Sequence, residues 1–272
     1  MDLRVSQLFI YPVKSLGGIA LQASEVTTRG LRHDRRWMLV DGSGRFLSQR
    51  EEARMALLEV SLQESSLRVY SKGNPEHRIE IPFLNKREVE FLPRMSVTIW
   101  QDQCSPVVYP DAIGAWFSDF LDQTCHLVYM DESVHRPVDV KYAHDQEINS
   151  FSDAYPLMMI GQGTLDDLNG RLTEPVPVNR FRPNLVFTGG DPFLEDQMHT
   201  FGIRGKVYKA VKPCARCIIP TIDQATGLKG EEPTRTLATY RLKDRKILFG
   251  QNVLVTSEGL IAVGDRLTID VN

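Results

Sequence analysis

The chain has 272 residues, of which 42% are hydrophobic and 25% charged, a composition typical of a folded protein with its own core. Its formal net charge of -3 argues against a general nucleic-acid binder, because such domains are usually strongly basic. No apolar run approaches the roughly 20 residues that span a bilayer, the amino terminus lacks a signal peptide, and the four cysteines are too few for a disulfide framework. We therefore expect a cytoplasmic protein with no nucleic-acid or membrane partner.

Short β-rich segments separated by Gly, Asn, Asp and Pro dominate the chain. They cover residues 4–13, 35–40, 96–101, 106–110, 125–130, 183–189, 205–211 and 251–269. The sequence DGSG at 41–44 lies between two apolar runs and predicts a hairpin loop. This punctuation is typical of a barrel or sandwich, so we predict a mainly β fold with a few short helices (α+β).

Three segments carry helical signals. A helix is predicted over 111–122, because Asp111 can cap a segment whose apolar residues follow helical spacing. A second helix is predicted at a capping box formed by Thr164 and Asp167, and a third begins near Pro233 and runs through TRTLATYRL. The buried stripe of the second helix is predicted to be Leu165, Leu168 and Leu172.

The first of these helices closes a β-rich first part of the chain. We therefore predict a domain boundary near residue 118, which gives domains 1–118 and 119–272. The polar segment 131–153 is predicted to be a long functional loop, because a structureless stretch of that length is uncommon in a compact domain.

The stretch KPCARCIIPTIDQATG at 212–227 places Cys214 and Cys217 close together. A thioredoxin-type dithiol is one reading, but the β-branched IIPTID that follows argues against a helix starting at Cys214. A structural zinc site needs four ligands, usually as two close pairs, whereas Cys104 and Cys125 lie 21 positions apart and no H-x3-5-H spacing occurs.

Both thiols of this stretch can also be inert residues at the end of a buried strand. Against this, Arg216 lies between them and Lys212 is close by. Basic neighbours favour a thiolate, and a thiolate is a strong ligand for soft metals. These residues alone leave the alternatives open.

Five separated motifs together resemble one family. They are LFIYPVKSLGG, GLRHDRRWMLVD, NRFRPNLVFTG, CARCIIPTIDQATG and LFGQNVLV…GLIAVGDRL. In this order they resemble MOSC-domain proteins, in the branch of the mitochondrial amidoxime-reducing component and its bacterial YcbX-like relatives. The resemblance covers almost the whole chain. It implies a MOSC N-terminal β-barrel domain and a MOSC β-barrel domain, with molybdenum cofactor (molybdopterin) held between them.

The resemblance also implies the residues of the site. In this branch the second cysteine of the motif ligates the metal, which makes Cys217 the implied catalytic residue and molybdenum ligand. The other implied cofactor-binding residues are Lys14, Ser15, Arg35, Ala154, Tyr155, Arg182, Asn184, Ala215, Arg216 and Asn252. Family members commonly have small polar residues at the positions of Ala154 and Tyr155 and a tyrosine at that of Asn252, so the chain departs from the pattern there. Ala154 can contribute only its backbone.

The chemistry of these residues agrees with an anionic ligand. Lys14 and the serine after it offer a point charge and a hydroxyl at a strand end, which suits phosphate. In a strand Arg35 and Arg36 cannot both face the ligand, and the resemblance selects Arg35. The i, i+2 spacing of Arg182 and Asn184 puts both on one face if that segment is extended.

The implied function is that of a molybdenum oxidoreductase acting on small N-hydroxylated substrates: N-hydroxylated bases, amidoximes or hydroxylamines. A polar loop at the site is expected to include Asp145 or Asp153. Electrons are expected from a separate flavin or iron–sulfur protein, because the chain lacks the C-x4-C-x2-C run of a ferredoxin domain and so has no iron–sulfur cluster of its own.

A different class of function stays open beside it. Larger MOSC proteins carry a pyridoxal-phosphate sulfurase domain, for which this chain has no room. The alternative is therefore a module that binds, carries or sulfurates molybdenum cofactor without turning over a small substrate. Cys104 and Cys125 are expected to be structural in either case.

Overall fold

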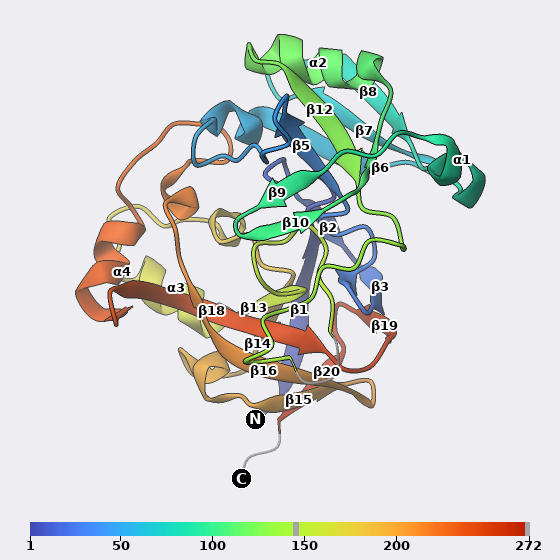
Figure 1. Cartoon of the computed structure of the whole chain (residues 1–272). Helices are drawn as coiled ribbons and strands as arrows, with labels where there is room; N and C mark the ends of the chain where they lie inside the picture. The colour runs from blue at the N-terminus through green and yellow to red at the C-terminus, as the bar shows by residue number, and fades with distance from the viewer. Residues whose placement is uncertain (144–146, 270–272) are drawn as a thin grey trace.

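A computed structural model describes residues 1–143 and 147–269 of the chain (Figure 1). The fold is mainly β with a few short helices, as predicted. Its centre is a closed barrel of seven strands in the order β13-β14-β1-β20-β15-β16-β18, in which β18 pairs back with β13. Their bounds are β1 Leu3–Ile10, β13 Leu157–Gly161, β14 Leu185–Thr188, β15 Thr200–Ile203, β16 Lys206–Ala215, β18 Lys246–Val255 and β20 Arg266–Ile269. A short strand β17, Leu242–Lys243, pairs with β18.

The first strand of the chain is part of this barrel. It pairs with β14 on one side and with β20 on the other, both antiparallel. Leu3, Val5, Leu8 and Ile10 are at most 2% exposed and pack in the core cluster with side chains of the other barrel strands. Burying each such side chain is worth about 1.5–3 kcal/mol, so the apolar pattern of β1 fixes its inward face.

Most of the remaining strands lie in the N-terminal half of the chain and form smaller sheets. One joins β5 (Trp37–Asp41), β12 (Cys125–Tyr129) and β11 (Val107–Val108), another joins β6 (Leu58–Leu62), β7 (Ser66–Ser71) and β8 (Asn74–Pro82), and a hairpin joins β9 (Val97–Ile99) to β10 (Asp102–Cys104). The short β2, Ile19–Leu21, pairs with β1. The DGSG segment forms the predicted turn, closed by a bridge between Val40 and Phe46.

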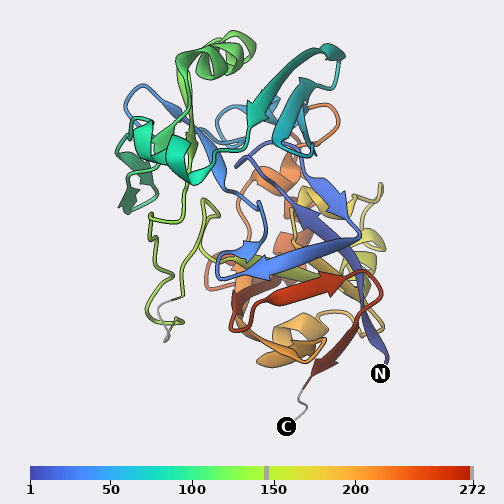
Figure 2. The same cartoon turned by 90° about the vertical axis from the view of Figure 1, so that its right-hand side faces the viewer.

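One small sheet joins the two ends of the chain. In it β3 (Ala23–Thr27) pairs with β4 (Gly30–Leu31) and with β19 (Gly259–Ala262), and Figure 2 shows the blue and red strands side by side. The N-terminal and C-terminal halves thus share both this sheet and the barrel. The domain boundary near residue 118 stays a prediction.

All three predicted helices are present. Helix α2 (Asp111–Leu121) follows Pro110, which takes the cap position expected for Asp111, and α4 (Thr234–Tyr240) follows Pro233. A helix α1, Lys86–Phe91, was not predicted. Single 3-10 turns cover Ala53–Leu57, Val178–Arg180, Leu194–Gln197 and Ile219–Thr221.

The second predicted helix is present, but its predicted capping box is wrong. Helix α3 runs over Gln162–Asn169, so Thr164 lies inside its first turn. The Thr164 hydroxyl instead donates to Glu195 Oε2 at 2.8 Å and accepts from the backbone N–H of Phe193 at 2.7 Å. Leu165 and Leu168 are buried as expected, and Leu172 lies beyond the helix end.

The segment 131–153 forms neither helix nor strand in its described residues, as predicted for a loop; Asp145 lies outside the described residues. Arg136, 4% exposed, anchors the end of this segment. Its guanidinium donates to the carbonyl oxygens of Ser150 at 2.9 Å and Ser152 at 2.5 Å, and its Nε to Asp102 at 2.8 Å. No helix of the described ranges is long and apolar enough to cross a membrane. The cytoplasmic location stays a prediction.

Candidate functional site

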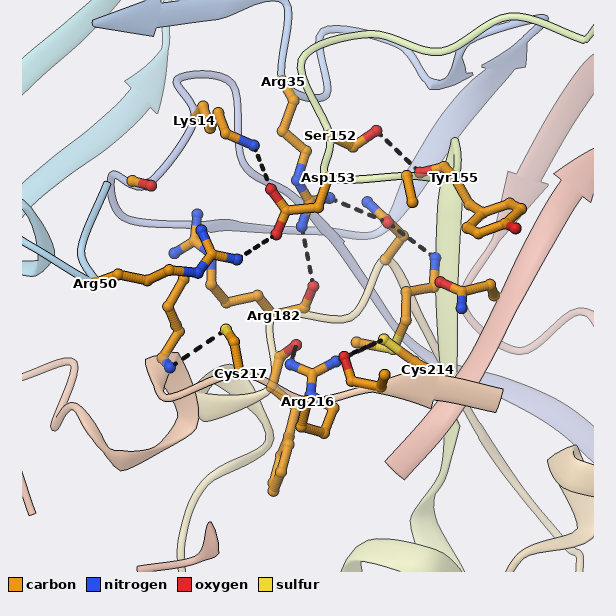
Figure 3. Close-up of a pocket in the computed structure, with 18 of the residues that line it drawn as sticks. Lys14, Arg35, Arg50, Ser152, Asp153, Tyr155, Arg182, Cys214, Arg216 and Cys217 are labelled. Atoms are coloured by element: carbon orange, nitrogen blue, oxygen red, sulfur yellow. Dashed lines mark hydrogen bonds and ion pairs between the residues drawn. The ribbon is translucent and has the colours of Figure 1, made fainter. Parts of the chain in front are cut away.

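All eleven residues that the sequence analysis assigns to the site line one pocket of about 260 Å³ (Figure 3). They come from the turns after β1 and before β5, from the segments before β13 and β14, from the end of β16 and the residues that follow it, and from β18. The other lining residues are Arg50, Ser152, Asp153, Met158, Phe181, Lys212, Cys214 and Ile219. The structure therefore brings the predicted residues together, while the role of each stays a prediction.

Three site residues have a left-handed backbone. The φ angles of Ser15, Arg35 and Arg182 are 67°, 49° and 55°, a region that costs non-glycine residues of the order of 1 kcal/mol or more and is concentrated at functional sites. The expectation that Arg35 lies in a strand was wrong, because it occupies a turn before β5. The condition that the segment of Arg182 is extended is not met, because Arg182 has a left-handed backbone in an irregular segment. Arg35 nevertheless faces the pocket, whereas Arg36 points elsewhere and pairs with Glu132 at 2.9 Å.

Two of these arginines lie against Tyr11. The Cζ atoms of Arg35 and Arg182 lie 4.5 Å and 4.1 Å from the centre of its ring. Arg35 is held by Asp34 at 2.7 Å and by the side-chain oxygen of Asn184 at 3.1 Å, so the Asn184 amide is engaged within the protein. Burial lowers the pKa of Arg182 to about 10, and its Nη2 has no hydrogen-bond partner in the described structure.

Lys14, Asp153 and Arg50 form an ion-pair bridge in the lining of the pocket. Lys14 Nζ donates to Asp153 Oδ1 at 2.5 Å and to the carbonyl of Phe151 at 2.8 Å, while Arg50 Nη2 lies 2.7 Å from Asp153 Oδ2. Burial lowers the pKa of Lys14 to about 8, although Asp153 opposes this. Burial would raise the pKa of Asp153, but the two cations hold it far below its usual range. Trp100 covers the bridge, with Arg50 Cζ 4.6 Å from its ring centre.

The two cysteines of the motif have different surroundings. Arg216 Nη1 donates to the Sγ of Cys214 at 3.1 Å, whereas the Sγ of Cys217 accepts from the backbone N–H of Ile219 at 3.5 Å. The cation that faces Cys217 is Arg50: burial lowers the pKa of this guanidinium, but Asp153 and Cys217 raise it overall. Arg216, the basic residue between the two cysteines, therefore contacts Cys214. Arg50, from the N-terminal half of the chain, is the cation that faces Cys217.

The positions where the chain departs from the family pattern also line the pocket. Tyr155 is 5% exposed, and its hydroxyl has no partner among the described residues. Lys212 Nζ lies 4.9 Å from the Tyr155 ring centre, and Asn252 Nδ2 donates to the Lys212 carbonyl at 3.3 Å. Ala154 is exposed and offers no side-chain donor. These residues shape the wall more than they add charge.

The charge of the lining favours an anion. Of the described lining residues, Asp153 is the one carboxylate. The cationic ones are Lys14, Arg35, Arg50, Arg182, Lys212 and Arg216. A concave site with so strong an excess of positive side chains attracts a negatively charged ligand.

Sequence reasoning missed Arg50. It stands in SQREEAR, a polar run without a motif, and its partner Asp153 lies 103 positions further along the chain. The other two cysteines lie on strands, Cys104 on β10 and Cys125 on β12. Burial raises the pKa of both thiols, that of Cys104 to about 11, which disfavours thiolate chemistry there.

Comparison with known proteins identifies the chain. Residues 2–124 match the family described as MOSC N-terminal beta barrel domain, and residues 146–268 match MOSC domain. The human mitochondrial amidoxime-reducing component 1 is 31% identical over 96% of this chain and 81% of its own length. A molybdenum cofactor sulfurase of Oryza sativa subsp. japonica is 29% identical over 98% of this chain, which spans 34% of that protein.

A solved structure aligns over a similar length. The YuaD protein of Bacillus subtilis covers 98% of this chain and 94% of its own at a TM-score of 0.46 and 10% identity. The family descriptions and the extent of the human match agree with the five motifs that line the pocket. The chain therefore belongs to the MOSC-domain family, with a MOSC N-terminal β-barrel domain, in the branch of the mitochondrial amidoxime-reducing components.

Proposed function

We propose that this protein is a molybdenum-cofactor-dependent oxidoreductase that reduces N-hydroxylated compounds with electrons from a separate reductase. The observation that carries the proposal is the pocket itself, in which a free thiol at Cys217 lies among six cationic side chains. The names of the relatives, an amidoxime-reducing component and a molybdenum cofactor sulfurase, support a function tied to this cofactor.

The residues present fit the cofactor, a pterin that carries a dithiolene and a phosphate. Cys217 offers the sulfur ligand that suits a soft metal site. The buried Nη2 of Arg182 and Nε of Arg216 lack partners in the described structure, and such orphaned donors are costly unless a ligand accepts from them. Lys14 and Arg50 also line the pocket, and their charges suit a phosphate.

When bound, the cofactor would supply the two-electron redox chemistry that removes the oxygen from an N–O group. The chain's own residues would bind and orient it. Cys217 would hold the metal from the pocket wall, with its Sγ steadied by the N–H of Ile219 at 3.5 Å. Arg182 and Arg216 would fix the pterin, since both guanidinium groups are already locked by packing and by backbone contacts.

Electrons and substrate both need access to this pocket. Ile218, next to Cys217, is 50% exposed, and the side chain of Asp153 is 47% exposed. The site therefore opens to solvent beside the proposed metal ligand. We propose a flavin or iron–sulfur protein as the electron donor, which docks over this opening. Turnover of an amidoxime by the purified protein with NADPH alone would contradict this part.

The decisive experiment is anaerobic purification from a host that makes molybdenum cofactor, followed by metal and pterin analysis. We expect bound molybdenum and pterin, and oxidation of the reduced protein by an amidoxime or a hydroxylamine. A protein that carries no molybdenum would overturn the proposal. A protein that binds the cofactor, exchanges it readily and is not oxidised by N-hydroxylated compounds would instead be a carrier or sulfur-transfer module.

A further inference from the structure

We infer that Asp153 is an internal counterion that occupies the anion site of the pocket, and that an incoming phosphate group must displace its carboxylate from Lys14 and Arg50. The inference rests on the proposed function only in that the phosphate is taken to be that of the cofactor. It assigns a role to two residues, Asp153 and Arg50, that belong to none of the recognised motifs.

The geometry of the bridge is that of an occupied anion site. One carboxylate oxygen of Asp153 lies 2.5 Å from Lys14 Nζ and the other 2.7 Å from Arg50 Nη2. A phosphate oxygen bound by an ammonium and a guanidinium makes the same charge-assisted contacts at the same distances. The side chains of Lys14 and Arg50 are only 6% and 18% exposed. Bulk water therefore cannot fully replace the contacts that they make with the carboxylate.

The backbone around Asp153 is held by hydrogen bonds, whereas its side chain is about half exposed. Arg136 donates from Nη2 to the Asp153 carbonyl at 3.2 Å and from Nη1 to the Ser152 carbonyl at 2.5 Å. The Asp153 side chain itself is 47% exposed, and the Nε1 of Trp100 offers it a third contact at 3.4 Å. Rotation of one side chain, without movement of the loop, therefore clears the two cations.

The positions of the two cations do not depend on Asp153 alone. Lys14 also donates to the carbonyl of Phe151 at 2.8 Å, and Arg50 also donates to the hydroxyl of Ser48 at 3.1 Å. They would keep their places when the carboxylate leaves. Asp153 therefore competes with the ligand, and it also keeps two buried cations paired when no ligand is present.

If the Asp153 carboxylate competes with phosphate, removing its charge should strengthen phosphate binding. Asp153→Asn keeps the size of the side chain and removes its charge, so the full-length protein without cofactor should bind inorganic phosphate about tenfold more tightly, which corresponds to about 1.4 kcal/mol. The titration is carried out near pH 6, below the pKa of about 8 that Lys14 has beside Asp153 in the wild type. Asp153→Asn lowers this pKa further, because it removes the carboxylate that raises it, so the low pH favours the charged form of Lys14 in both proteins. Isothermal calorimetry gives the dissociation constants.

Two controls tie the effect to this site. Asp223→Asn removes a half-exposed carboxylate that pairs with Arg180 at 3.2 Å outside the pocket lining, and should leave phosphate binding unchanged. Lys14→Gln added to Asp153→Asn should abolish the gain. In the wild type, phosphate should change the fluorescence of Trp100, and this change should be absent from Trp100→Phe.

Each outcome decides the matter. Unchanged or weaker phosphate binding by Asp153→Asn would show that the carboxylate positions the cations and does not compete. If that variant fails to fold, the wild-type titration remains decisive: phosphate binding without any signal from Trp100 would overturn the inference. Because none of these measurements uses molybdenum, they stand or fall separately from the proposed enzymatic activity.

Discussion

Arg216 donates a hydrogen bond from Nη1 to the Sγ of Cys214 at 3.1 Å, and its Nη2 donates to the carbonyl of Phe181 at 2.7 Å. The arginine between the two cysteines is thus anchored to the first of them. Cys217 is left to face the pocket and Arg50. The pair consists of one sulfur that takes part in positioning an arginine and one that is available to a ligand.

This difference predicts unequal effects of matched substitutions. Cys217→Ser should lose the molybdenum of a protein purified from a cofactor-producing host, because a serine hydroxyl is a poor ligand for a soft metal site. Cys214→Ser should retain it, since the hydroxyl can still accept from Arg216. Metal analysis measures the result. Equal loss in both variants would favour a dithiol or a zinc site. Full molybdenum-linked activity in Cys217→Ser would exclude this cysteine as the ligand.

The charge of Lys14 makes anion binding depend on pH. Its pKa in the folded protein is about 8, below the ordinary value of 10.5, so it loses its proton as the pH rises through about 8. Affinity for sulfate, whose own charge is constant in this range, should therefore fall over that interval. Lys14→Arg, which stays charged, should flatten the pH profile in calorimetric titrations. A wild-type profile that is already flat would count against a role for Lys14.

The lowered pKa of Lys14 affects stability in the opposite direction from anion binding: as the pH rises, anion affinity falls but stability increases. Between about pH 8 and 10.5 the unfolded chain binds the Lys14 proton and the folded protein does not. The contribution of this residue to the free energy of unfolding should therefore increase over that window. Comparing denaturant titrations of the wild type and of Lys14→Met across these pH values isolates it, because the methionine does not titrate.

Gly30, on β4, lies where the small sheet of β3, β4 and β19 packs against the segment that carries Tyr155. Its φ is +101°, and an added Cβ would lie 2.4 Å from the carbonyl oxygen of Pro156, next to Tyr155 in the lining. Gly30→Ala should therefore lower the free energy of unfolding by roughly 2 kcal/mol or more. Gly42→Ala, where nothing lies within 4 Å of the added atom, should change it by less than about 0.5 kcal/mol. Urea denaturation of both variants tests the contrast.

Arg136 is expected to be the main support of the segment that carries Asp153. Arg136→Met would leave the buried carbonyls of Ser150 and Ser152 without their donor, at a cost of about 3 kcal/mol. Arg45→Met, which breaks an exposed pair with Glu51, should cost less than about 1 kcal/mol. Proteolysis that remains as slow in Arg136→Met as in the wild type would show that other contacts hold the segment.

Local and non-local features differ in how far the sequence predicted them. The apolar spacing of residues 111–122 predicts α2, because a helical face is a local pattern. The left-handed backbone conformations of Arg35 and Arg182 have no such signal, since neither residue is a glycine or an asparagine, and tertiary packing imposes them. Arg50 reaches the site through a contact 103 positions away, which no motif near it announces. The resemblance to the family predicted the pocket residues, whereas residue spacing alone did not decide between the possible roles of the two cysteines.

The place of β1 in the barrel has a consequence for how the protein is made. Its neighbours are β14 and β20, which begin at Leu185 and Arg266 and so lie far from β1 in the sequence. The barrel therefore closes only after β20 has been synthesised, and until then β1 lacks its second partner. Non-local closure of this kind slows folding and leaves strand edges open to aggregation in the meantime. A fragment that begins after β1 would lack one barrel strand and expose the edges of β14 and β20. The barrel therefore cannot close without β1.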